Sequence, residues 1–217
     1  MLIHPWDAAQ NDAEWQQWLA VHDFGQLVVN GLPGQAPYSQ PLHFVYDAER
    51  GDVLTHLARP NPVWPAIEAN PRVLLSVVDD YVHVPGPWQA PMGTPSEHGV
   101  PTSFYAAVQL HCTAHLIDAP EQKAELLNRQ VSHFQPEGGS AAAAVGRQPY
   151  GRMLSGIRGL RLEVTEVRAK FKYGSHKPAD VQDRTAAGLA GRGGARDEAA
   201  HAHHLRRRSP SGQAGTG

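Results

Sequence analysis

The feature that most constrains the fold is one long alternating segment, TSFYAAVQLHCTAHLID, at residues 102–118. Apolar side chains occupy every second position, which is the period of one face of a β-strand. That face comprises Phe104, Ala106, Val108, Leu110, Cys112, Ala114 and Leu116. A strand of this length with an apolar face needs neighbouring strands and a core to cover it. The chain is therefore expected to build a sheet.

Other β-rich segments supply the neighbours. They are FGQLVVNG, SQPLHFVYD, DVLTHLA, RVLLSVVDDYVHV and the run that contains Leu160, Leu162 and Val164. Short connections join most of them, without a regular alternation of strands and helices. This order predicts a mainly antiparallel sheet that closes into a barrel, with helices packed outside.

Two segments have helical spacing. Residues 12–22 place Trp15, Trp18 and Leu19 three and four positions apart. Residues 121–134 repeat apolar side chains at Ala124, Leu127, Val131 and Phe134. Asp118 and Glu121 match a capping box, which predicts the start of this second helix.

The domain organisation follows from the same pass along the chain. We expect one domain over residues 1–187, with its helices at the periphery, and a disordered tail over residues 188–217. The tail is rich in Gly, Ala, Arg and His, and it lacks the apolar surface that offsets the entropy of ordering.

Composition narrows the class of protein. A formal net charge of −2 gives no global attraction to nucleic acid or anionic membranes. The single Cys112 excludes an internal disulfide framework, and its place on the apolar face of a strand predicts an inert thiol. The N-terminus lacks the apolar run of a signal peptide or anchor, so a cytoplasmic protein is expected.

The thirteen histidines raise the question of a metal site. His111 and His115 share a strand face, but four residues of strand separate them by roughly 13 Å. His201, His203 and His204 lie in the expected tail. No metal site is predicted.

The joint THLARPNPVW, residues 55–64, carries more hydrogen-bonding capacity than a turn needs. Asn61 suits an N-cap and Pro62 a first helical residue, and helix N-termini attract phosphate. Arg59 adds a guanidinium group that can bind two phosphate oxygens at once. Free backbone donors are expected at the amides of Arg59, Asn61, Val63 and Trp64. The alternative is structural: Arg59 on the surface, Asn61 a simple cap and Trp64 in the core.

Three stretches in order, THLARPNPVW, PTSFYAAVQLHCTAHLID and KFKYGSHKPAD, resemble the PaiB-like family of FMN-binding negative transcriptional regulators. The resemblance spans about residues 20 to 190. It implies an FMN-binding split β-barrel, as in pyridoxamine phosphate oxidases, and a homodimer with flavin at the subunit interface.

The resemblance also implies which residues contact the flavin. Thr55, His56, Arg59 and Asn61 would face its phosphate and ribityl chain. Further contacts would come from Trp88 in VPGPWQAPMG, Thr102 and Tyr105 in PTSFY, and Lys172 in KFKYGSH. Ser103 and Phe104 stand where the family usually has Trp-Asn, and Tyr173 replaces a Leu.

Three functions remain open at this point. The first is an FMN-binding regulator, with DNA as a partner implied by the family name. No helix-turn-helix is visible, and the arginines between residues 147 and 168 fit either a DNA-binding patch or an ordinary solvated face. The second is an FMN-dependent oxidoreductase acting on a small molecule. The third is a split barrel that has lost FMN and binds haem or another ligand.

Overall fold

The computed structural model describes residues 1–208. Its strands are β1 (Phe24–Val29), β2 (Tyr38–His43), β3 (Val45–Asp47), β4 (Asp52–Ala58), β5 (Arg72–Val84), β6 (Thr102–Ile117) and β7 (Ile157–Lys172). Its α-helices are α1 (Asp12–Leu19), α2 (Trp64–Ala69), α3 (Pro120–Phe134), α4 (Ala179–Arg192) and α5 (Asp197–Arg206).

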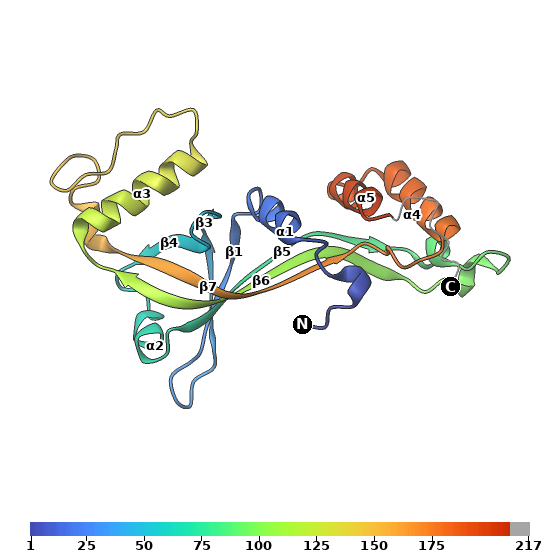
Figure 1. Cartoon of the computed structure of the whole chain (residues 1–217), viewed down its shortest axis with the longest axis horizontal. Helices are drawn as coiled ribbons and strands as arrows, with labels where there is room; N and C mark the ends of the chain where they lie inside the picture. Colours follow the sequence, from blue (N-terminus) through green and yellow to red (C-terminus); the bar gives the residue numbers. More distant parts are fainter. Residues whose placement is uncertain (209–217) are drawn as a thin grey trace. The chain divides into compact units, whose positions relative to one another are not determined.

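The strands of the described residues form one seven-stranded sheet in the order β2-β1-β5-β6-β7-β4-β3 (Figure 1). The pairs β1–β2, β1–β5, β3–β4 and β4–β7 are antiparallel. β2 and β3 end the order, so the sheet is open. This confirms a mainly antiparallel sheet with helices around it. Among these helices, none is both long and apolar enough to cross a bilayer.

The chain divides into two compact units. Unit 1 comprises residues 1–10, 78–107 and those from 169 onward, and unit 2 comprises residues 11–77 and 108–168. Unit 2 contains α1, α2, α3 and β1 to β4, whereas unit 1 contains α4 and α5. The long strands β5, β6 and β7 run through both units.

The apolar alternation that predicted β6 is confirmed. Its expected inner face is buried from Phe104 to Ala114, and Leu116 is half-buried. Burial raises the pKa of the Cys112 thiol to about 12. The thiol therefore stays protonated at neutral pH, which agrees with the expected lack of reactivity. In unit 2, α1 buries Trp15, Trp18 and Leu19, as its spacing predicted.

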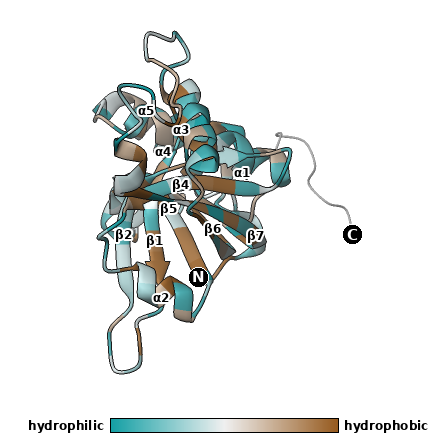
Figure 2. Cartoon of the chain, turned by 90° about the vertical axis from the view of Figure 1, so that its left-hand side faces the viewer, coloured by the Kyte–Doolittle hydropathy of each residue, from teal (hydrophilic) through white to brown (hydrophobic). Residues whose placement is uncertain are grey.

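The core follows the strands. Leu27 and Val29 of β1 are fully buried, as are Val53 of β4 and Leu160 and Leu162 of β7. Figure 2 shows hydrophobic residues along the strands, whereas the connecting loops are largely hydrophilic. Burial of alternating side chains therefore accounts for the sheet, as hydrophobic periodicity does in general.

The predicted capping box at Asp118 is wrong. α3 begins at Pro120 after Ala119, and no side chain caps it. The Asp118 carboxylate instead accepts hydrogen bonds from two arginines, Arg59 and Arg158. Charge-assisted bonds to guanidinium groups are about twice as strong as neutral ones, so they outcompete a backbone cap.

The prediction of Asn61 as an N-cap is also wrong. α2 begins at Trp64, after Val63, and Asn61 Oδ1 accepts a hydrogen bond from the Val63 amide at 3.0 Å in a turn before the helix. Pro65 occupies an early helical position, where it lacks an N–H group and biases Trp64 away from helical geometry. These restrictions account for a late and short helix.

The prediction of a disordered tail over residues 188–217 is wrong for residues 188–208, which contain the end of α4 and all of α5. Leu189, Ala200 and His204 are buried. Both ring nitrogens of His204 lie within hydrogen-bonding distance of carbonyl oxygens, at 2.6 Å from Tyr173 and 2.9 Å from Gln182. These few anchors order a segment of unpromising composition. Residues 209–217 lie outside the described part of the chain.

Two glycines of α4 provide a matched test of its packing. A Cβ on Gly188 would lie 2.5 Å from the Trp88 ring, whereas nothing lies within 4 Å of one on Gly191. Gly188→Ala should lower the free energy of unfolding by about 1–3 kcal/mol through overpacking. Gly191→Ala should raise it by roughly 0.5–1 kcal/mol, because alanine favours the helix. Urea denaturation of both variants measures this, and equal effects would contradict the packing of Trp88 against α4.

Candidate functional site

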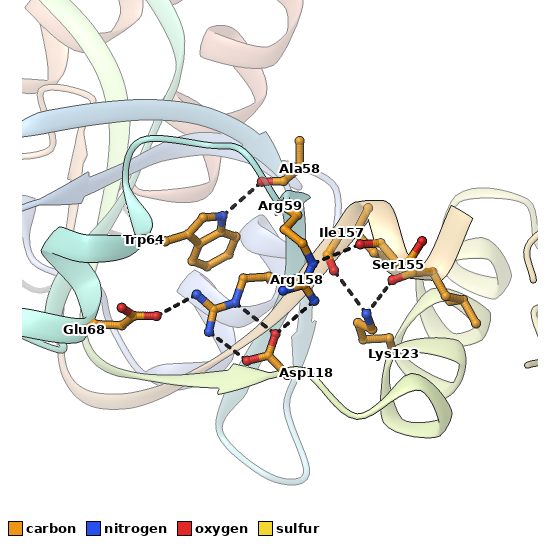
Figure 3. A network of polar contacts seen from close by, with 10 residues as sticks. Ala58, Arg59, Trp64, Glu68, Asp118, Lys123, Ser155, Ile157 and Arg158 are labelled. Carbon is orange, nitrogen blue, oxygen red and sulfur yellow. Dashed lines mark hydrogen bonds and ion pairs between the residues drawn. The ribbon is translucent and has the colours of Figure 1, made fainter. Parts of the chain in front are cut away.

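The turn after β4 carries a cluster of charged residues in unit 2, which we call the Arg59 cluster. It consists of Arg59, Glu68, Asp118, Lys123 and Arg158, which come from five separate places in the sequence (Figure 3). Arg59 follows β4, Glu68 lies on α2, Asp118 follows β6, Lys123 lies on α3 and Arg158 lies on β7.

Arg158 is the most heavily bonded member. Its Nε and Nη2 donate to the two oxygens of Asp118 at 2.9 and 2.7 Å, and its Nη1 donates to Glu68 at 2.7 Å. Its guanidinium carbon also lies 5.0 Å from the centre of the Trp64 ring. Trp64 is fixed in turn, because its indole N–H donates to the Ala58 carbonyl at 3.0 Å. Arg158 is thus held in one orientation.

Arg59 approaches the same carboxylate from another side. Its Nη2 donates to Asp118 at 3.3 Å and its Nε to the Ser155 carbonyl at 2.9 Å. The Arg59 side chain remains 47% exposed, whereas that of Arg158 is 14% exposed. Two guanidinium groups therefore converge on one anionic group at the surface.

Electrostatics reinforces this arrangement. The hydrogen bonds from Arg158, followed by the charges of Arg158 and Arg59, hold the pKa of Asp118 below its ordinary value. Asp118 and then Glu68 raise the pKa of Arg158 further. Burial, followed by the nearby charge of Arg59, lowers the pKa of Lys123, whose ammonium donates to the carbonyls of Leu154 and Ile157. With Lys123 protonated, the cluster has three cations and two carboxylates, and it attracts anions.

The other residues predicted for the same anion are occupied elsewhere in unit 2. Thr55 is fully buried, and its hydroxyl donates to the His43 carbonyl at 2.7 Å. His56 Nδ1 lies 2.6 Å from the side-chain oxygen of Gln130. Asn61 Nδ2 donates to Gln40 at 2.9 Å. These side chains are placed around the end of β4, but their hydrogen bonds connect β4 and the turn after it to β2 and α3.

The expectation of free amides in this turn is wrong for three of the four. The Arg59 amide donates to Gly156 at 2.8 Å, the Asn61 amide to Ala58 at 3.0 Å, and the Val63 amide to Asn61. Proline-rich turns have few amides, and here the Asn61 and Val63 amides bond within the turn while the Arg59 amide bonds to the segment before β7. The capacity to bind an anion therefore rests on the two guanidinium groups.

A small cavity of about 200 Å³ adjoins His43 and His56 in unit 2. The two rings lie 5.5 Å apart, and burial, followed by the charge of His56, lowers the pKa of His43. Within residues 1–208 there is no group of three His, Cys, Asp or Glu residues that could hold a metal ion.

The remaining predicted residues lie in unit 1. Lys172 Nζ donates to the Thr102 hydroxyl at 3.1 Å and lies 5.8 Å from the centre of the Tyr105 ring. The structure thus brings Thr102, Tyr105 and Lys172 together. Trp88 is apart from these contacts: it packs against Gly188 and lies beneath the Arg192 guanidinium at 5.2 Å.

The sequence predicted Arg59 as a site residue but not Glu68, Lys123 or Arg158, and Arg158 was considered only as one of several arginines of a possible DNA-binding patch. Side chains at every second position of a strand point to the same face. Arg158 therefore shares the face of β7 that carries the buried Leu160 and Leu162. An arginine in such a register needs carboxylate partners. This signal was available in the sequence, although the identity of the partners was not.

The open antiparallel sheet with flanking helices defines the chain as a split β-barrel, the predicted fold class. The chain belongs to the family described as "Putative FMN-binding domain", whose model matches residues 1–166. Family membership supports FMN as the cofactor, as predicted.

Solved structures share the fold. The FAD and heme binding protein of Mycobacterium smegmatis has a TM-score of 0.60 and 18% identity, over 84% of this chain and 80% of that one. The flavocytochrome Anf3 of Azotobacter vinelandii has a TM-score of 0.59 and 17% identity, over 77% and 70%. No curated protein matches the chain.

The residues present suit the phosphate of FMN in their chemistry. Arginine forks match phosphate oxygens in the same bidentate way as they match a carboxylate. In unit 2 the carboxylate of Asp118 marks the point on which two such forks converge.

The lowered pKa of Asp118 predicts a pH dependence of stability. The ionised carboxylate stabilises the fold fully above its ordinary pKa, and this contribution is lost as the pH falls through the lower pKa of the folded state. The difference in unfolding free energy between the wild type and Asp118→Asn should be constant above about pH 5 and shrink towards about pH 2. Because Asp118 is half-exposed, this difference should not exceed about 1 kcal/mol. Urea titrations across this range measure it, and a pH-independent difference would contradict the ion pair.

Proposed function

We propose that the chain holds the phosphate of FMN between Arg59 and Arg158. The observation that carries this proposal is the convergence of both guanidinium groups on one carboxylate. A phosphate that displaced this carboxylate would bind to guanidinium donors that Trp64 and Ser155 already hold in orientation. Preorganised donors lose little entropy on binding, which favours affinity.

Asp118 has a second role in this proposal. Its carboxylate occupies the donors that the phosphate needs, so it competes with the ligand and keeps the arginines aligned when the ligand is absent. Arg158 remains tied to Glu68 at 2.7 Å, which leaves Arg59, the more exposed arginine, as the group that reorients. Flavin, when bound, supplies reversible transfer of electrons or hydride.

At the level of biological role, we propose an FMN-binding regulator of the PaiB-like kind. It would be a cytoplasmic homodimer with flavin at the subunit interface, and DNA is its proposed partner. The support is the order of the three sequence stretches, together with membership of the FMN-binding family. Specific retardation of DNA that survives moderate salt would support this role. Loss of all retardation at such salt would count against it.

An FMN-dependent oxidoreductase is the second candidate. A structural relative is described as a flavocytochrome, a redox protein by that name. Bleaching of bound flavin by NADPH, with turnover on an added acceptor, would favour this candidate over the regulator.

Haem in place of flavin has less support. One structural relative is described as binding haem together with FAD. The cavity beside His43 and His56, of about 200 Å³, is smaller than the usual range for ligand pockets, which begins at about 300 Å³. An absorbance spectrum of the purified protein, with mass analysis of what it releases, separates flavin from haem.

Riboflavin provides the sharpest test of the phosphate site, because it lacks the phosphate. Arg59→Gln and Arg158→Gln should each weaken FMN binding at least about tenfold, as expected for a charge-assisted bond, and leave riboflavin binding unchanged. Fluorescence titration of both ligands measures the effect. Arg147→Gln, which removes an exposed arginine outside the cluster, serves as the control. Equal losses for both ligands would assign the arginines to folding.

Asp118→Asn should change affinity in the opposite direction. Removal of the competing carboxylate should tighten FMN binding by several-fold and again leave riboflavin unaffected. Weaker FMN binding in this variant would show that Asp118 supports the arginines without competing with the phosphate. The same fluorescence titration measures both outcomes.

A further inference from the structure

A separate cavity of about 300 Å³ lies within unit 1, and we call it the Lys172 pocket. Its flat walls come from Trp6 and His176, whose rings lie 4.9 Å apart, and Phe104 also contributes to its lining. His4, which also lines the cavity, stacks on Trp6, with ring centres 4.7 Å apart and planes 11° apart. The pocket thus combines aromatic surfaces with a volume that suits a small molecule.

The N-terminal wall of this pocket is fixed in place. The Trp6 carbonyl accepts a hydrogen bond from Ser175 at 2.7 Å, and the Ala8 carbonyl accepts one from Arg207 at 2.6 Å. Lys170 binds the Leu2 carbonyl at 2.9 Å. These bonds hold residues 2–8 against the end of β7 and α5, so the pocket is preformed.

The charges in the lining are unbalanced. Lys172 and Lys177 both line the pocket, and within the described part of the chain neither has a carboxylate within ion-pair distance. Lys172 donates to the neutral Thr102 hydroxyl. Asp7, the acidic residue of the lining, has its Oδ2 3.9 Å from Lys170, and its Oδ1 is buried without a hydrogen-bond partner. The pocket therefore presents two ammonium groups to an anion.

His176 contributes a ring and not a third cation. Burial, followed by the charge of Lys177, lowers its pKa below the ordinary value for histidine. At neutral pH the imidazole is mainly uncharged, and it provides an aromatic surface in contact with Trp6. Aromatic walls with cations in the lining match a planar ring that carries a negative group.

We propose that the Lys172 pocket binds a small planar aromatic carboxylate. The ring lies against Trp6 and His176, and the carboxylate binds Lys172 and Lys177. Lysine ammonium groups are compact point charges, which suits a small carboxylate. This inference goes beyond the proposed phosphate site, which consists of residues of unit 2. The resemblance implies flavin contacts for Thr102 and Lys172 of the lining, so competition with FMN is part of the test.

Benzoate is a suitable probe, with benzamide as the neutral molecule of the same shape. Isothermal titration calorimetry on the full chain should show saturable one-to-one binding of benzoate, and benzamide should bind at least about tenfold more weakly. Lys172→Gln and Lys177→Gln should each weaken benzoate binding about tenfold, and Trp6→Ala by several-fold. Arg147→Gln removes a charge of the same sign outside the pocket and should leave binding unchanged.

Four outcomes would overturn the proposal. They are the absence of saturable benzoate binding, equal binding of benzamide, unchanged binding in both lysine variants, and stoichiometric displacement of benzoate by FMN. The last result would make the pocket part of the flavin site. Lys177 is half-buried and lies between β7 and α4. Lys177→Gln therefore tests the proposal even where Lys172→Gln fails to fold. Loss of FMN binding with benzoate binding intact would contradict the proposed function alone.

Discussion

The ion pair between Arg158 and Asp118 is the interaction on which the organisation of unit 2 depends. Arg158 lies on the inner face of β7, and its side chain is mostly buried. An unpaired guanidinium there would cost folding free energy. Asp118, Glu68 and the Trp64 ring satisfy it, and they come from the end of β6 and from α2. A single buried cation thereby fixes where α2 lies and how β6 leaves the sheet. Because Asp118 and Glu68 are both about half-exposed, loss of one carboxylate costs less here than it would in a fully buried pair.

The same pair explains why an anion site forms beside β4 although at least three of the amides in the turn there are already hydrogen-bonded. Arg59 is drawn to Asp118 because that carboxylate is already oriented by Arg158. The Asp118 carboxylate is thus shared between the fixed guanidinium of Arg158 and the more exposed one of Arg59. The same guanidinium donors therefore stabilise the fold and bind the anionic ligand. A change that strengthens ligand binding is expected to weaken the fold, and the reverse. Such competition is common where a fold keeps charges in place for a ligand.

Periodicity made much of the fold predictable, because burial of alternating side chains is a local property of the sequence. β6 and α1 follow from it. Features that depend on partners distant in sequence did not follow. The order of residues 188–208 depends on Gly188 meeting Trp88 and on the two carbonyl partners of His204. The sequence predicted Arg59 as a residue of the site. The hydrogen bonds that occupy the backbone amides of the turn could not be predicted, because they depend on how the turn folds.

The two units differ in how they present positive charge, and this difference separates their ligands. In unit 2 the cations are mainly arginines, and carboxylates hold them in planar forks that match a phosphate. In unit 1, Lys172 and Lys177 have no such carboxylate among the described residues, and an aromatic wall lies beside them. Lysines without a carboxylate partner keep more of their hydration, so they exchange small anions readily. A tightly held cofactor therefore suits the arginines, and a ligand that must arrive and leave suits the lysines.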